Sequence, residues 1–142
     1  MRSQYSAALF GLALAACQSG ESAPASGPTE AFSGIALDET VYLTGTEPFW
    51  NAEVSASKAI YSTPENQDGV SFKVDRFAGN NGLAFTGSID GAAFDLTVTP
   101  GECSDGMSDR TYPYTATLRI GEDQRNGCAW TDLQNFSGPA HP

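Results

Sequence analysis

Residues 83–99 have the sequence LAFTGSIDGAAFDLTVT, and this stretch decides the fold class. Over residues 94–99 apolar and polar side chains alternate strictly, which is the period-two pattern of a strand with one buried face. Residues 83–89 are a weaker strand candidate, and Asp90-Gly91 lies between the two segments. Because an Asp-Gly pair favours a tight hairpin turn, the stretch predicts two antiparallel strands joined at residues 90 and 91.

The same pattern recurs on both sides of this hairpin. Clear alternation covers residues 70–75 and 114–120, and weaker candidates cover residues 35–43, 49–56, 59–62 and 124–130. Further turn signals are Asp68-Gly69, residues 80–82, Pro100-Gly101 and Gly121-Glu122. Strands about ten residues apart, with no helical pattern beyond a turn near Leu133, predict an all-β antiparallel meander. We expect it to close into a small β-barrel, since closure removes exposed edges, with a two-layer β-sandwich as the alternative.

The composition narrows the range of functions. The length of 142 residues permits one domain, and 17 acidic against 7 basic residues give a net charge of −10. Such a charge disfavours nucleic acid, which needs a basic protein surface. The single histidine, His141, lies one residue from the C-terminus, so a serine or cysteine nucleophile has no evident base. These features favour a small secreted β-domain that does not bind nucleic acid.

The N-terminal residues have the order of a signal peptide. Arg2 precedes a short apolar stretch at residues 5–14, and small residues lead to Cys17. A buried N-terminal helix is the alternative interpretation. The ending Leu-Ala-Ala-Cys is similar to the lipobox of bacterial lipoproteins, which implies that Cys17 is acylated and becomes the first residue of the mature chain. In that family a residue other than Asp after the cysteine, here Gln18, implies the outer membrane.

These signals divide the chain into four parts. We expect residues 1–16 to be the lipoprotein signal peptide and residues 17–33 to be the lipidated cysteine and a flexible tether. The tether is rich in Ser, Gly, Ala, Pro and Glu and buries too little apolar surface to fold. The β-domain is expected at residues 34–137 and a C-terminal tail at residues 138–142. Removal of residues 1–16 also removes Arg2, which takes the net charge from −10 to −11.

With Cys17 acylated, Cys103 and Cys128 remain. An even number of cysteines in an oxidising compartment is most simply a disulfide. A redox pair and a thiolate metal site are the alternatives. A catalytic dithiol usually has a closer spacing, and a thiolate metal site needs more ligands than two distant cysteines supply.

The sequence GTEPFW at residues 45–50 is the first of two motifs. Pro48 has no backbone N–H and therefore belongs at the start or edge of a strand. Phe49 and Trp50 are adjacent, so on a strand their side chains point to opposite faces. Either Trp50 enters the core and Phe49 lies under a loop, or an aromatic side chain and Glu47 form a binding lip.

The second motif, CSDGMSDR at residues 103–110, lies between two predicted strands. One interpretation is a compact loop in which Asp and Ser side chains bond nearby backbone amides. Another is a Ca²⁺ site at Asp105, Ser108 and Asp109, although the spacing matches no EF-hand. The loop also offers Met107 and Arg110 to a ligand, unless Arg110 is buried and paired with Glu47 or Asp109. The candidate binding residues of both motifs are Glu47, Phe49, Trp50, Asp105, Met107, Ser108, Arg110 and Tyr112.

Together with GCA at residues 127–129, the sequences GTEPFW and CSDGMSDRTYP resemble a family of uncharacterised bacterial envelope lipoproteins. The resemblance covers most of residues 43–130. It implies a periplasmic β-domain with a disulfide between Cys103 and Cys128, and it implies no particular activity. In size, acidity and anchor the chain is also loosely similar to periplasmic lysozyme inhibitors and META-type domains, although the motifs of neither are present.

We therefore expect a monomeric protein, lipid-anchored at the outer membrane and facing the periplasm, with no cofactor and no metal. Its acidity favours a non-catalytic binding module for a cationic protein, peptide or small ligand. One alternative is a small hydrolase that uses Glu47 and Asp105 as paired carboxylates. A structural component of the envelope is the other.

Overall fold

The computed structural model of the chain describes residues 30–139. The expected signal peptide, the expected lipidation site at Cys17 and most of the tether lie outside the described residues, as does His141. Among residues 30–139 no helix is long and apolar enough to cross a membrane.

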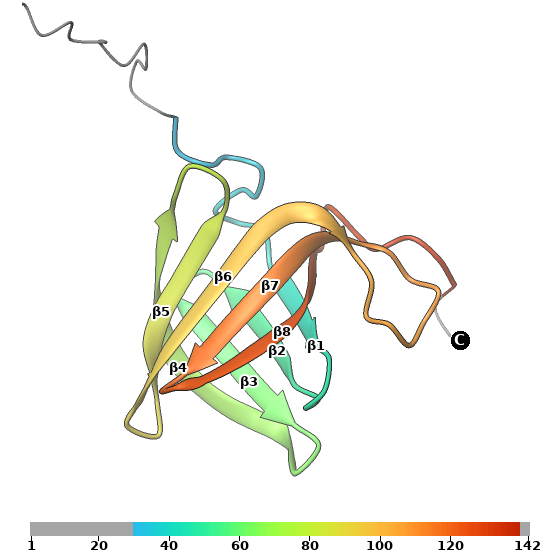
Figure 1. Cartoon of the computed structure of the whole chain (residues 1–142). Coiled ribbons are helices and arrows are strands. Elements are labelled where there is room, and N and C mark those ends of the chain that lie inside the picture. Colours follow the sequence, from blue (N-terminus) through green and yellow to red (C-terminus); the bar gives the residue numbers. More distant parts are fainter. Residues whose placement is uncertain (1–29, 140–142) are drawn as a thin grey trace, which may run out of the picture.

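Eight antiparallel strands form a closed barrel, in which each strand pairs with the next and the first pairs with the last (Figure 1). The strands are β1 (Val41–Gly45), β2 (Asn51–Ser55), β3 (Lys58–Thr63), β4 (Asn66–Ala78), β5 (Leu83–Ile89), β6 (Ala92–Cys103), β7 (Tyr112–Ile120) and β8 (Asp123–Thr131). The predicted all-β barrel is therefore confirmed, and the sandwich alternative is wrong. Every strand candidate of the sequence overlaps a strand of the barrel.

Two of the predicted turns are wrong. Asp68-Gly69 lies inside β4 and Pro100-Gly101 lies inside β6, where the pairing with the neighbouring strand shifts register. Gly69 has a φ of 78°, which only glycine adopts freely, and this backbone conformation makes a bulge rather than a hairpin. The turn between β3 and β4 falls earlier, at residues 64–65. By contrast, Asp90-Gly91 does form the hairpin turn, with positive φ at both residues.

The barrel interior is filled by the apolar side chains of the alternating pattern. Phe94, Leu96 and Val98 of the opening stretch are all buried, and the side chain of Trp50 is completely buried in the same core. Trp50 packs against Tyr61 with ring centroids 6.3 Å apart. The core is therefore continuous from the strands to the turn that joins β1 and β2.

One end of the barrel is plugged by the segment that precedes β1 and the segment that follows β8. Ile35 is buried in the core, although the strand predicted at residues 35–43 begins only at Val41. Arg76 of β4 holds this segment by donating hydrogen bonds to the carbonyls of Ile35 and Ala36, at 2.6 and 3.2 Å. The N–H of Phe32 donates to the carbonyl of Gly79 at 2.7 Å, so contacts with the barrel begin two residues before the expected domain boundary at residue 34.

Glu39 is the buried polar centre of the plug. Its carboxylate accepts hydrogen bonds from the backbone N–H of Ala36, the hydroxyl of Thr131 and the amide of Gln134. Burial works to raise the pKa of Glu39, but these hydrogen bonds and the charge of Arg76 outweigh burial and lower the pKa. The ionised carboxylate therefore joins the segment before β1 to the segment after β8.

The opposite end, which we call the mouth, carries four hairpin connections. These are residues 46–50, 64–65, 90–91 and 121–122. At the first of them, the backbone N–H of Gly45 donates to the carbonyl of Trp50 at 2.7 Å. A Cβ on Gly45 would lie 2.0 Å from Nε1 of Trp50, so the indole rests directly on the glycine backbone. The order G-T-E-P-F-W thus buries its tryptophan because its glycine leaves room for the ring.

We predict that Gly45→Ala lowers the free energy of unfolding by about 1–3 kcal/mol, since the added methyl overpacks the core against Trp50. Chemical denaturation followed by tryptophan fluorescence measures this change. Gly79→Ala is the matched control, because its Cβ meets no atom nearer than 3.7 Å. Equal stability of the two variants would contradict the packing described for Trp50.

Candidate functional site

The structure separates the two sequence motifs. Glu47 and Phe49 lie in the first connection of the mouth, whereas residues 104–111 join β6 to β7 at the plugged end, well to one side of the barrel in Figure 1. Trp50 belongs to the core and is not accessible to a ligand. The candidate binding residues therefore do not form one site.

A pocket of about 720 Å³ opens at the mouth. Its lining comes from the turn between β1 and β2, the turn between β3 and β4, and the beginning of β8. The lining residues are Glu47, Pro48, Phe49, Thr63, Pro64, Glu65 and Arg125. We call this hollow the mouth pocket. It falls in the size range of ligand sites, about 300–1,000 Å³, and the mouth of a β-barrel is a common place for such sites.

Arg125 is the cation of the mouth pocket. It lies on β8 two residues before Gly127, which is buried, and it therefore shares the inward-facing phase of that strand. Its Nη1 donates a hydrogen bond to the hydroxyl of Tyr61 at 2.7 Å. Tyr61 is on β3, which is not a neighbour of β8, so this bond crosses the barrel interior just below the mouth.

Tyr61 stays a neutral phenol beside this arginine. Burial raises the pKa of Tyr61, the charge of Arg125 lowers it and the charge of Glu65 raises it, with a net increase. The phenol oxygen accepts from Arg125, and its own proton remains available to a second acceptor. The inner part of the mouth pocket thus carries the guanidinium of Arg125, which a neutral phenol holds in place under an acidic rim.

Acidic residues surround the mouth. Carboxylates are present on the turns or strand ends of all four hairpins, at Glu47, Glu65, Asp90, Glu122 and Asp123. Phe49 is 42% exposed and lines the mouth pocket together with Glu47 and Glu65. The rim combines negative charge with one exposed aromatic side chain.

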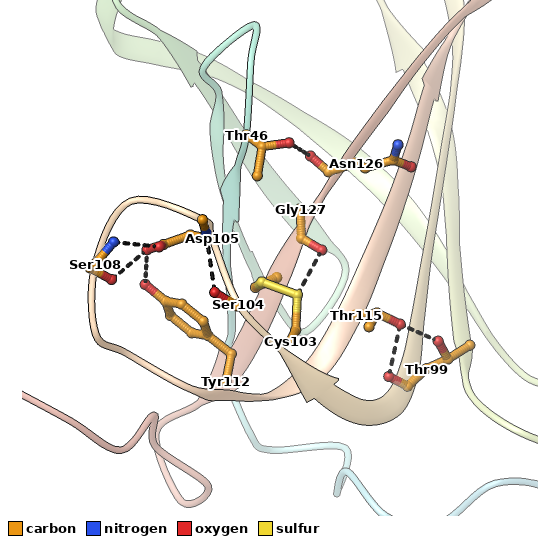
Figure 2. The surroundings of a disulfide bond; sticks show 12 residues. Thr46, Thr99, Cys103, Ser104, Asp105, Ser108, Tyr112, Thr115, Asn126 and Gly127 are labelled. Carbon is orange, nitrogen blue, oxygen red and sulfur yellow. Dashed lines mark hydrogen bonds between the residues drawn. A yellow bond between two sulfur atoms is a disulfide. The ribbon is translucent and has the colours of Figure 1, made fainter.

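The second motif is an internally bonded loop. Asp105 Oδ1 accepts from the backbone N–H groups of Met107 and Ser108, at 2.9 and 2.8 Å, and Figure 2 shows the bond from Ser108. Asp105 Oδ2 accepts from the hydroxyls of Ser108 and Tyr112, at 2.7 and 3.1 Å. Both carboxylate oxygens are therefore engaged inside the loop. Within residues 30–139 no group of three or more His, Cys, Asp or Glu side chains is placed to hold a metal ion.

The Cys103–Cys128 disulfide, which is present as predicted, ties this loop to β8. Tyr112 packs outside the barrel against Trp130 and Phe136, with ring centroids 5.4 and 5.5 Å apart. Arg110 lies over the ring of Phe136 at 4.4 Å, rather than pairing with Glu47 or Asp109 as one alternative expected. Met107 is 60% exposed at the tip of the loop. The loop covers a small aromatic cluster on the outer face of the sheet.

Two lining residues of the mouth pocket, Glu65 and Arg125, were not predicted as site residues from the sequence, and neither was Tyr61, whose hydroxyl Arg125 bonds. Glu65 was missed because the turn between β3 and β4 was placed at Asp68-Gly69. Arg125 did carry a signal, since it is a charged residue in phase with the small inward residues Gly127 and Ala129.

Comparison of the chain with models of protein families, with curated proteins and with solved structures finds no match.

The hydrogen bonds of Asp105 make a prediction about pH. Burial works to raise the pKa of Asp105, but the N–H groups of Ser108 and Met107 and the hydroxyls of Ser108 and Tyr112 lower it from 3.8 to about 2. Because the pKa is lower in the folded state, the ionised carboxylate stabilises the fold above about pH 4, and this contribution is lost as the pH falls towards 2.

Asp105→Asn is therefore expected to lower the free energy of unfolding by about 1–2 kcal/mol at pH 7, after allowance for solvent screening. The difference from the wild type should shrink between pH 4 and pH 2 in denaturant titrations. Asp109→Asn, in the same loop but exposed, serves as the control and should change stability little. A difference between wild type and Asp105→Asn that does not vary with pH would count against a structural role of the carboxylate.

Proposed function

We propose that the chain is a non-catalytic binding module of the bacterial cell envelope, anchored through an acylated Cys17 at the outer membrane and facing the periplasm. Its partner is a cationic protein or peptide, and the mouth pocket is the binding site. The observation that carries this proposal is the pocket of about 720 Å³, in which exposed Phe49 lies beside Glu47 and Glu65.

The charge of the molecule supports a cationic partner. Without residues 1–16 the chain has a net charge of −11, which creates a field that accelerates the encounter with a positive protein. Carboxylates at the four hairpins of the mouth concentrate that field around the pocket. An exposed aromatic side chain in a concave site supplies the apolar contact that charge alone lacks.

The position of the pocket also suits an anchored protein. The N-terminal segment meets the barrel at the plugged end, where Phe32 bonds Gly79. The mouth pocket lies at the opposite end. A tether attached at the plugged end therefore leaves the end with the mouth pocket free of the anchor.

The contacts of Asp105 favour binding over the paired-carboxylate alternative. Glu47 lines the mouth pocket, but Asp105 is engaged with Met107, Ser108 and Tyr112 in the loop between β6 and β7. With a pKa of about 2, Asp105 is ionised at neutral pH and cannot serve as a general acid.

The proposal predicts that binding depends on the acids of the mouth. We call residues 18–142, which lack the signal peptide and the acylated cysteine, the soluble domain. In isothermal titration calorimetry its dissociation constant for deca-lysine is expected to be about tenfold higher in the Glu47→Gln/Glu65→Gln variant than in the wild type. The affinity should also fall steeply as salt increases, because solvent-exposed charges are screened.

The matched control is Asp75→Asn/Asp95→Asn, which removes the same charge from exposed positions on the wall of the barrel. This variant should weaken deca-lysine binding only slightly. If both double variants weaken binding equally, the mouth pocket is not the site and the peptide is attracted by net charge alone.

A further inference from the structure

The mouth pocket contains opposite charges at different depths. Arg125 points inward from β8 and is tied across the interior to Tyr61, whereas Glu47 and Glu65 lie on the exposed turns above. A pocket for simple polycations would not need an arginine on its floor, because that charge repels them. The arrangement therefore favours a ligand that carries both a negative and a positive charge.

The hydrogen bonds of Arg125 indicate what its guanidinium binds. Among residues 30–139 its side chain makes one hydrogen bond, from Nη1 to Tyr61. This bond fixes the orientation of the guanidinium plane and leaves its other N–H groups for a ligand. A planar guanidinium with two adjacent free donors matches a carboxylate bidentately.

The rim of the pocket indicates the rest of the ligand. Glu47 and Glu65 come from two different turns and face the same hollow, together with Phe49 and two prolines. Carboxylates beside an aromatic surface suit a cationic group at the end of an aliphatic chain. A lysine or arginine residue with a free α-carboxylate has these features in this order, with its anionic end inside and its cationic end outside.

Resting on the function proposed above, we infer that the mouth pocket binds the carboxyl-terminal lysine or arginine of a cationic polypeptide. Arg125, oriented by its bond to Tyr61, holds the terminal carboxylate, and Glu47 and Glu65 hold the basic side chain against Phe49. The size of about 720 Å³ gives room for the last one or two residues of the chain.

The test uses two peptides of identical sequence that end in lysine, one with a free carboxylate and one amidated. Titration calorimetry of the soluble domain should show the amide binding about tenfold more weakly or worse, because it cannot pair with the guanidinium. In Arg125→Gln the two peptides should bind alike. Arg119→Gln, which removes an exposed arginine of the outer wall, should leave the preference for the free carboxylate intact.

The outcomes distinguish this inference from the proposed function. Equal binding of both peptides to the wild type overturns the inference, while the proposed function stands if Glu47→Gln/Glu65→Gln still weakens both. Unchanged binding of both peptides and of deca-lysine in that double variant overturns both proposals. Since the comparison of the two peptides is made on the wild type, it does not depend on the folding of Arg125→Gln.

Discussion

The antiparallel pairing of β1 with β8 is the interaction on which the rest of the structure depends. It extends from Val41 opposite Thr131 to Gly45 opposite Gly127 and converts an open meander into a barrel without free edges. The two strands approach so closely that a Cβ on Gly127 would lie 2.3 Å from the carbonyl oxygen of Thr44. Because closure leaves the interior filled by side chains, a ligand can be received only at an end of the barrel or on its outer face.

The two ends differ because the chain enters and leaves at the same one. The segments before β1 and after β8 meet around buried Glu39 and close that end with hydrogen bonds. Only hairpins remain at the mouth, where Arg125 lies beneath acidic turns. The polar groups of the plug are satisfied by one another, whereas those of the mouth pocket are turned towards a solvent-accessible hollow. This contrast is why we place recognition at the mouth.

The sequence predicts the barrel well because period-two alternation is a local consequence of burying one face of each strand. It misplaces Asp68-Gly69 and Pro100-Gly101 because a glycine serves a bulge as readily as a turn. It predicts half of the site: Glu47 and Phe49 line the pocket, but Arg125 reaches it only through the pairing of β8 with β1, and Glu65 lies in the turn that the sequence placed at Asp68-Gly69. The loop at residues 103–110 has the composition of a binding loop, since the Asp and Ser residues that bond a backbone are also those that bind ligands.

Mapping a lysine-terminated peptide on the isotopically labelled domain by nuclear magnetic resonance tests most directly whether the mouth is the binding site. Binding there predicts that the amide signals of Thr46, Glu47, Glu65 and Arg125 shift in a saturable way, while that of Met107 in the distant loop stays in place. Shifts confined to Met107 and its neighbours, with the signals of the mouth unchanged, would contradict a binding site at the mouth. They would place the binding site in the loop between β6 and β7.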